Sequence, residues 1–308
     1  MPKDIEAFRP TNTIRRFATI HMPEDAEAPI LSEDLRTAVH QWIVEIGSAE
    51  ELEKVRLKPR RTAMLSGPPG TGKTTLAHHM AARLGLPLVL VNMAMLVSCY
   101  VGQSAQNIDA LFGAIQEQAD SCVLFLDEFD AIATRRRTGE GAGGERNSIV
   151  VALLQRIDAH PGMLIAATNL AGDIDPAIWR RFSIHLEIAE PDDDCRWAIL
   201  KRYLEPLTLP DEAIDVLTDI TAGASPAVLR QLMEGVRRDI VLSPKFKWPT
   251  EVRRVFRRIV STVRPHATAT LPPLWGEPWA LDKVAGISWP PVLPPADGNP
   301  DPAPGTNT

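Results

Sequence analysis

The stretch TAMLSGPPGTGKTT, residues 62–75, decides the fold of this chain. Its first five residues form a short apolar run of the kind that makes a buried strand. A glycine-rich segment follows in the spacing G-x-x-x-x-G-K-T and ends in Lys73 and Thr74. Apolar residues at helical spacing, beginning with Leu76 and Met80, continue after it. A strand, this loop and a helix in that order predict the P-loop of an α/β nucleotide-binding fold.

The P-loop predicts a site for the phosphates of a nucleotide. Glycines let backbone N–H groups turn inward around phosphate oxygens, and the positive end of the helix dipole supports them. We expect Lys73 to reach the β and γ phosphates and the Thr74 hydroxyl to ligate Mg²⁺, so ATP and Mg²⁺ are the expected cofactors. The expected nucleotide contacts are Gly67, Pro68, Pro69, Gly70, Thr71, Gly72, Lys73, Thr74 and Thr75.

Polar side chains follow two further apolar runs. The run Cys122–Leu126 leads straight into Asp127 and Glu128. We expect Asp127 to hold Mg²⁺ through water and Glu128 to polarise the attacking water, which would make this a hydrolase site. The run 164–167 ends before Asn169, whose amide is expected to hydrogen-bond the γ-phosphate or the lytic water. The alternative is that these polar residues only terminate their strands.

The distribution of apolar runs predicts the fold class. Buried-strand patterns alternate with helical ones, which is typical of an α/β fold with a parallel sheet covered by helices on both faces. After Pro191 the strand patterns stop and four helical patterns follow, which predict a small all-helical lid domain. The expected strands are Thr62–Ser66, Leu88–Val91, Cys122–Leu126, Leu164–Ala167 and Ile184–Ile188, and the expected helices are 193–205, 211–222, 225–242 and 250–263.

These patterns predict four segments: an irregular N-terminal segment (1–27), an α/β domain (28–190), a helical lid (191–264) and a C-terminal tail (265–308). Eleven of the 27 prolines lie in the tail, so we expect it to be mostly extended. It also carries Trp275, Trp279 and Trp289. These indoles indicate either that the tail covers an apolar patch on its own domain or that it docks a partner.

Composition excludes several classes of protein. The 308 residues are 44% hydrophobic and 23% charged, which is typical of a globular chain and not of a collagen, a coiled coil or a disordered chain. The formal net charge of −6 provides no global basic field for nucleic acid or membrane. Three scattered cysteines, no signal-type N-terminus and no apolar run of the ~18–20 residues that span a bilayer favour a cytoplasmic location.

Over roughly residues 28–242 the chain resembles an AAA family ATPase, within the AAA+ class. GPPGTGKT matches the family's Walker A motif, VLFLDEFDAIATRR matches Walker B, and AATN matches sensor 1. DPAIWRRF, residues 175–182, resembles the family's DPALxRRF element and is similar to a bacterial subset with WRRF. The resemblance implies an ATPase that assembles into a ring, expected to be a hexamer of identical subunits.

The same resemblance implies that Arg181 is an arginine finger, inserted into the ATP site of the neighbouring subunit, with Arg180 as a possible helper. A guanidinium suits this role because it is planar, always charged and able to contact two phosphate oxygens. Many relatives have another arginine three residues after the first, but Ile184 stands there in this chain. Adjacent arginines could otherwise form only a solvated face.

The resemblance also places a pore loop at residues 96–104, where Tyr100 and Val101 would grip an extended polypeptide in the central channel. The alternative for Tyr100 is a place in the core. Arg135–Arg137 fall where relatives have a second pore loop, and they are either substrate contacts or solvated charge.

Together these features predict Mg²⁺-dependent ATP hydrolysis by a ring that remodels or translocates a protein substrate. One alternative is a DNA-associated AAA+ ATPase, supported by the arginine-rich helical pattern at 252–260, although the acidic net charge makes nucleic acid the less favoured partner. Another is a nucleotide-switched scaffold that recruits a partner through its tail. No membrane partner is expected.

Overall fold

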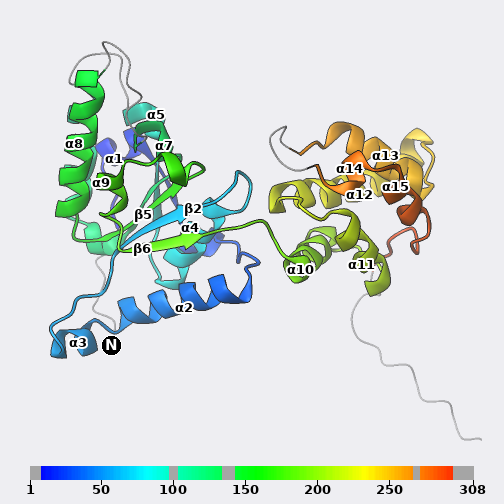
Figure 1. The fold of residues 1–308 in the computed structure, drawn as a ribbon, viewed down its shortest axis with the longest axis horizontal. Helices are drawn as coiled ribbons and strands as arrows, with labels where there is room; N and C mark the ends of the chain where they lie inside the picture. Colours follow the sequence, from blue (N-terminus) through cyan, green and yellow to red (C-terminus); the bar gives the residue numbers. More distant parts are fainter. Residues whose placement is uncertain (1–7, 97–102, 134–142, 266–270, 294–308) are drawn as a thin grey trace, which may run out of the picture. The chain divides into compact units, whose positions relative to one another are not determined.

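The structure is a computed structural model that describes residues 8–96, 103–133, 143–265 and 271–293. The chain divides into two compact units, Met1–Pro191 and Asp192–Thr308 (Figure 1). The first unit is built around one β-sheet, and the helices that follow Pro191 make up the second unit. The α/β fold followed by a helical region is therefore confirmed.

The sheet of the first unit has six strands in the order β1-β3-β4-β5-β2-β6. β1 runs antiparallel to β3, and all other neighbours are parallel. Ser66 lies opposite Thr168 in the register of β2 and β5, so the carboxyl ends of these strands meet at one edge of the sheet. The strands are β1 (Ala18–His21), β2 (Thr62–Ser66), β3 (Leu88–Val91), β4 (Val123–Leu126), β5 (Met163–Thr168) and β6 (Ile184–Glu187).

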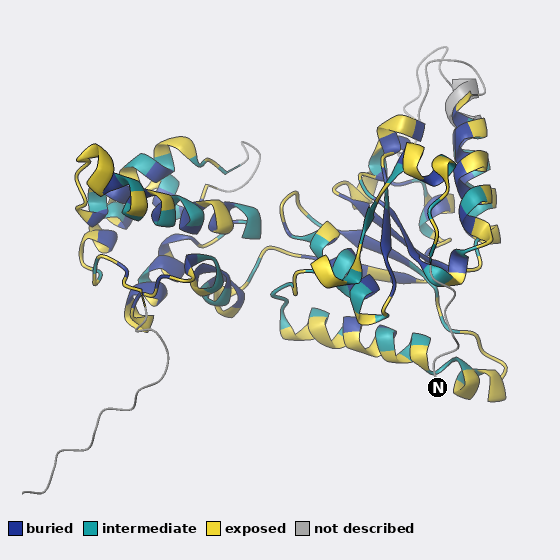
Figure 2. Cartoon of the chain, turned by 180° about the vertical axis from the view of Figure 1, so that it is seen from behind, coloured by how far each residue is buried: buried dark blue, intermediate teal, exposed yellow. Residues whose placement is uncertain are grey.

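Helices cover both faces of this sheet because its strands are apolar on both sides, and Figure 2 shows the strands as buried between helices. Met64 of β2 faces one apolar cluster, while its neighbours Ala63 and Leu65 face the other. The first face is covered by α1 (Asn12–Phe17), α5 (Met93–Leu96), α6 (Gln103–Gln116), α7 (Asp130–Ala133), α8 (Gly143–Ala159) and α9 (Pro176–Trp179). The second is covered by α2 (Glu33–Gly47) and α4 (Lys73–Arg83). α3 (Ala49–Lys54) and the 3-10 helices η1 (Pro23–Asp25), η2 (Ala119–Ser121) and η3 (Ala171–Asp173) complete the unit.

The N-terminal segment differs from the irregular structure expected for residues 1–27. α1 begins after Thr11, whose hydroxyl accepts from the Ile14 N–H (3.3 Å), and it buries Ile14 and Phe17 in the core. β1 then extends the sheet beside β3, and the Asn92 N–H donates to the Phe17 carbonyl (2.8 Å). The expectation was wrong for residues 12–21 because both elements are very short and their partners are distant in the sequence.

The second unit contains the four predicted helices. They are α10 (Asp193–Leu204), α11 (Asp211–Ile220), α12 (Pro226–Phe246) and α13 (Val252–Thr262). α10 is capped by Asp192, whose carboxylate accepts from the Cys195 N–H (2.8 Å), and α12 has Pro226 at its first position. Among the residues that the structure describes, no helix is both long and apolar enough to cross a bilayer.

The C-terminal segment is not mostly extended where the structure describes it. Residues 273–285 form α14 (Pro273–Gly276) and α15 (Pro278–Ala285), each of which begins with a proline at its first helical position. The Trp275 Nε1 donates to the Val263 carbonyl (2.6 Å), and the Trp289 Nε1 donates to the Thr250 carbonyl (2.9 Å). Counting prolines was misleading because proline at the first position of a helix starts it rather than breaks it.

A half-buried histidine, His160, follows α8, and its ring Nε2 is shielded from solvent. The His160 ring contacts Phe112 edge-on, with centroids 6.0 Å apart, and no protein group among the described residues hydrogen-bonds its Nε2. Burial lowers the pKa of His160 to about 4, against a smaller opposing effect of the Met163 backbone. The neutral ring is therefore the form that the folded protein accommodates.

His160 makes the stability of the protein fall in mild acid. Between the folded pKa of about 4 and the unfolded value of 6.5 the unfolded state binds more protons, so stability is full above pH 6.5 and is lost as the pH falls toward 4. We expect His160→Leu to remove roughly 2–3 kcal/mol of this loss, measured by urea unfolding at neutral pH and at a pH near 4. His40→Leu, at an exposed position on α2, is the matched control. An equal acid loss in wild type and His160→Leu would show that other groups cause it.

Candidate active site

The P-loop follows β2 at the carboxyl edge of the sheet. Gly67, Gly70 and Gly72 all have positive φ angles (151°, 79° and 94°), which glycine adopts without a Cβ clash. The Thr71 hydroxyl donates to the Pro68 carbonyl (2.9 Å) and closes the loop on itself. The hydrogen-bond ladder of α4 starts with the Leu76 N–H and the Gly72 carbonyl (2.8 Å), so earlier amide groups have no place in that ladder. The loop and the first turn of α4 therefore present N–H groups suited to phosphate.

Gly67 is also required because β6 ends against it. The Ile188 N–H donates to the Ser66 carbonyl (2.7 Å), and a Cβ on residue 67 would overlap the Ile188 carbonyl. Backbone, unlike a flexible side chain, has little freedom to move away. The start of the loop is thus held between β2 and the segment after β6.

We expect Gly67→Ala to weaken nucleotide binding by at least about tenfold and to destabilise the first unit by about 1–3 kcal/mol. The new methyl group would push the end of β6 away, and the alanine backbone would have to adopt a strained φ. A fluorescent ATP analogue and thermal unfolding measure the two effects. Gly113→Ala is the matched control, since a Cβ there meets nothing within 4 Å on α6. Equal nucleotide affinity in both variants would contradict the packing argument.

Lys73 folds back onto the loop. It is buried, and its Nζ donates to the carbonyls of Gly67 and Pro68, both at 2.8 Å. Burial lowers the pKa of the ammonium, while the carboxylates of Asp127 and Asp130 oppose that shift. A cation held inside a loop of N–H donors fits the chemistry of a polyphosphate.

The two predicted magnesium ligands are in direct contact. The Thr74 hydroxyl donates to Asp127 Oδ2 (2.7 Å), which joins the first turn of α4 to the end of β4. The other carboxylate oxygen of Asp127 accepts from the Glu128 N–H (2.9 Å). Glu128 is exposed and has a left-handed backbone (φ 51°), an uncommon conformation for a residue with a Cβ. A hydroxyl and a carboxylate side by side are the hard oxygen donors that Mg²⁺ prefers.

Asp130 is a site residue that the sequence analysis missed. Its Oδ1 accepts from the Thr168 hydroxyl (2.9 Å) and from the Asn169 N–H (3.1 Å), and the neighbouring Phe129 N–H donates to the Ala167 carbonyl (2.8 Å). These bonds tie the end of β4 to the end of β5 and fix the backbone that carries Asn169. The available signal was a third acidic residue two positions after Glu128.

Arg181 is not brought to this site. Its carbonyl accepts from the Thr62 hydroxyl (3.0 Å) at the first residue of β2, whereas the P-loop follows the last residue, Ser66. Four steps of about 3.3 Å, or about 13 Å, separate the two ends of that strand. The Arg181 Nε pairs with Asp158 Oδ1 (2.9 Å) at the end of α8, a partner that the sequence analysis also missed. Arg180, also exposed, follows α9 as its C-cap.

An aromatic pair connects the acidic segment to the arginine element. Phe129 follows Glu128, Phe182 follows Arg181, and the two buried rings meet edge-on with centroids 5.8 Å apart. This is a favourable geometry for aromatic rings. The backbones that carry Glu128 and Arg181 are thereby anchored in one core.

Other residues singled out by sequence lie elsewhere. Tyr100, Val101 and Arg135–Arg137 lie outside the described residues. The arginines of α13 are largely neutralised within the second unit, through the pairs Arg253–Asp282, Arg254–Glu251 and Arg258–Asp239. This helix also buries its apolar face, so its basic face does not favour the DNA-associated alternative.

Comparison with known proteins identifies the relatives of this architecture. Residues 63–190 match the family described as ATPase family associated with various cellular activities (AAA). An uncharacterized AAA family ATPase, y4kL of Sinorhizobium fredii, is 42% identical over 165 residues, which are 53% of this chain and 48% of the relative. A proteasome-activating nucleotidase of Thermococcus gammatolerans is 34% identical over 65% of this chain and 51% of its own length. The ATP-dependent zinc metalloprotease FtsH 3 of Sphaerobacter thermophilus is 34% identical over 60% and 39%. The chain thus spans about half the length, or less, of these relatives.

Proposed function

Since residues 63–190 are an AAA family ATPase domain, we propose that this chain hydrolyses ATP with Mg²⁺ at the P-loop edge of its sheet. Lys73 and the loop N–H groups would bind the phosphates. Thr74 and Asp127 would hold Mg²⁺, which when bound neutralises charge on the phosphate oxygens. Glu128 would accept a proton from the water that attacks the γ-phosphorus, while the bond from that phosphorus to the ADP oxygen breaks. Asn169 would orient the γ-phosphate or this water.

The observation that carries this proposal is the convergence of three chain segments at one edge. The Thr74–Asp127 bond joins the P-loop helix to β4, and the Asp130 bonds join β4 to the backbone of Asn169. N–H groups suited to phosphate, oxygen atoms suited to a hard cation and the further carboxylate of Glu128 therefore follow neighbouring parallel strands, which supports the proposal. Few chemistries other than phosphoryl transfer need this combination.

We further propose that the active form is a ring, expected to be a hexamer, in which Arg181 completes the site of the next subunit. Support comes from the position of Arg181 at the far end of β2 from its own P-loop. The relatives include proteasome-activating nucleotidases and an ATP-dependent metalloprotease, which favours a protein substrate. Tyr100 and Val101 would then contact that substrate in the pore.

Turnover per subunit, measured over a wide range of protein concentrations, tests the shared site. A site completed by a second copy requires specific activity to rise with concentration and to level off once the ring is assembled. Analytical ultracentrifugation of the same samples relates activity to assembly. Constant specific activity in samples that stay monomeric would leave a monomeric nucleotide switch as the better description.

A further inference from the structure

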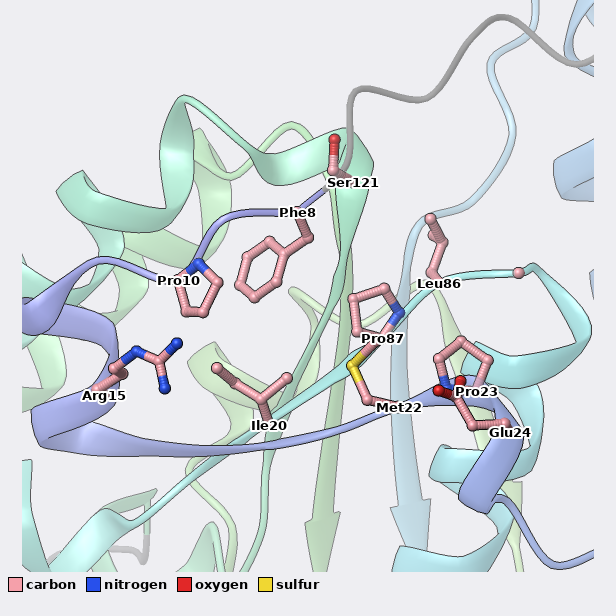
Figure 3. Close-up of a pocket in the computed structure, with 11 residues that line it drawn as sticks. Phe8, Pro10, Arg15, Ile20, Met22, Pro23, Glu24, Leu86, Pro87 and Ser121 are labelled. Carbon is pink, nitrogen blue, oxygen red and sulfur yellow. The ribbon is translucent and has the colours of Figure 1, made fainter.

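A groove of about 620 Å³ lies in the first unit, at the end of the sheet opposite the P-loop (Figure 3). Leu86 and Pro87 line it just before β3 begins, and Ser121 lines it just before β4. Its remaining wall comes from the N-terminal segment that sequence reasoning took as irregular. A ligand in this groove would therefore not compete with nucleotide.

The inner surface of the groove is apolar. Ile20 and Met22 lie on the same side of the chain at β1, because residues two apart in a strand share a face. His21, between them, turns to the opposite face, where its ring lies 5.4 Å from that of His78 on α4. Figure 3 shows Phe8 and Pro87 facing the same space from the other walls. The groove can therefore accept an aliphatic or aromatic side chain.

The two charged side chains that line this groove, Arg15 and Glu24, lie at its opposite ends. Residues 8–22 contain Arg9, Arg15 and Arg16 and no acidic residue, in a chain whose net charge is −6. The Arg15 guanidinium points over the groove between Pro10 and Ile20 (Figure 3). Within the described residues no carboxylate lies within ion-pair distance of Arg15. Glu24 lines the opposite end and gives the groove a polarity.

We propose that this groove binds an extended, acidic segment of a partner polypeptide. A carboxylate of that segment pairs with Arg15, and a neighbouring apolar side chain enters the space between Phe8, Ile20 and Met22. Glu24 repels a second acidic group at the far end and thereby sets the direction of the segment. A nucleic acid offers no aliphatic side chain for the recess, and a flat membrane surface does not reach into it. The inference extends the proposed function, since a protein-remodelling ATPase has to recruit its partner.

Fluorescence anisotropy with two rhodamine-labelled octapeptides, GEELLVPG and its charge-reversed form GKKLLVPG, tests the groove in nucleotide-free buffer. We expect saturable binding of the acidic peptide, weaker at high salt, and at least about tenfold weaker binding of the lysine peptide. Arg15→Glu and Met22→Asp are each expected to weaken binding about tenfold. Arg36→Glu and Leu57→Asp, exposed positions in the same unit, are the matched controls and should bind normally.

Three results would overturn the proposal: equal affinity for both peptides, affinity unchanged by Arg15→Glu, or no saturable binding. The last is decisive when it also holds for the Asp4→Asn/Glu6→Gln variant, which removes the acidic side chains that precede the groove in the sequence. Displacement of the peptide by oligothymidylate or by anionic vesicles at lower concentrations than by unlabelled peptide would assign the surface to another class of partner. Basal ATPase is measured separately, so failure of the proposed hydrolysis leaves the binding result interpretable.

Discussion

Glu128→Gln is expected to bind ATP as tightly as the wild type and to hydrolyse it at least about 100-fold more slowly, which is the typical contribution of a general base. The glutamine side chain has nearly the same shape but does not take up the proton of the attacking water. Its backbone N–H still donates to Asp127 Oδ1, so the Thr74–Asp127 contact is retained. Binding of a fluorescent ATP analogue and release of phosphate, measured on the same preparation, separate affinity from turnover.

Glu51→Gln, exposed on α3, makes the same chemical change on an element that supplies no residue of the P-loop site and serves as the control. Its turnover should equal that of the wild type. Normal turnover in Glu128→Gln would remove Glu128 from the mechanism, whereas loss of ATP binding would indicate that Glu128 holds the loop rather than activates water.

The P-loop and the strands around it could be predicted because their signals are local. Three glycines with positive φ, Lys73 and Thr74 lie within eight residues, and each acts within that loop or in the first turn of the helix. The buried strands could be predicted for the same reason, since parallel strands covered on both faces are continuous apolar runs in the sequence. Asp127 and Glu128 could be assigned because they follow such a run directly.

What could not be predicted depends on contacts between distant residues. β1 is four residues long and is a strand only because β3, about 70 positions later, lies beside it. The link from Asp130 to the Asn169 backbone spans 39 positions in the sequence. The ion pair between Arg181 and Asp158 joins the segment before β6 to the end of α8. The C-terminal helices were missed for a different reason, because proline has opposite effects at the start and in the interior of a helix.

Arg181→Ala is expected to reduce ATP turnover by at least about 100-fold in the assembled protein, in line with the effect of arginine fingers on phosphoryl transfer. The fold should be retained, since the Thr62 hydroxyl bonds the main-chain carbonyl of residue 181 and not its side chain. The exposed ion pair with Asp158 is worth at most about 1 kcal/mol. Steady-state turnover at a concentration that saturates assembly measures the effect, with Arg36→Ala as the control for loss of a surface charge.

Mixing two inactive variants distinguishes action on the neighbouring site from action on the protein's own site. Arg181→Ala subunits keep Glu128, and Glu128→Gln subunits keep Arg181, so a mixed ring contains interfaces at which both groups are intact. If assembly is random and sites act independently, about a quarter of the sites in an equimolar mixture are restored. If Arg181 served its own subunit, no mixture would regain activity. The distance of about 13 Å along β2 makes restoration the expected result, because that separation exceeds the reach of an arginine side chain held at the other end of the strand.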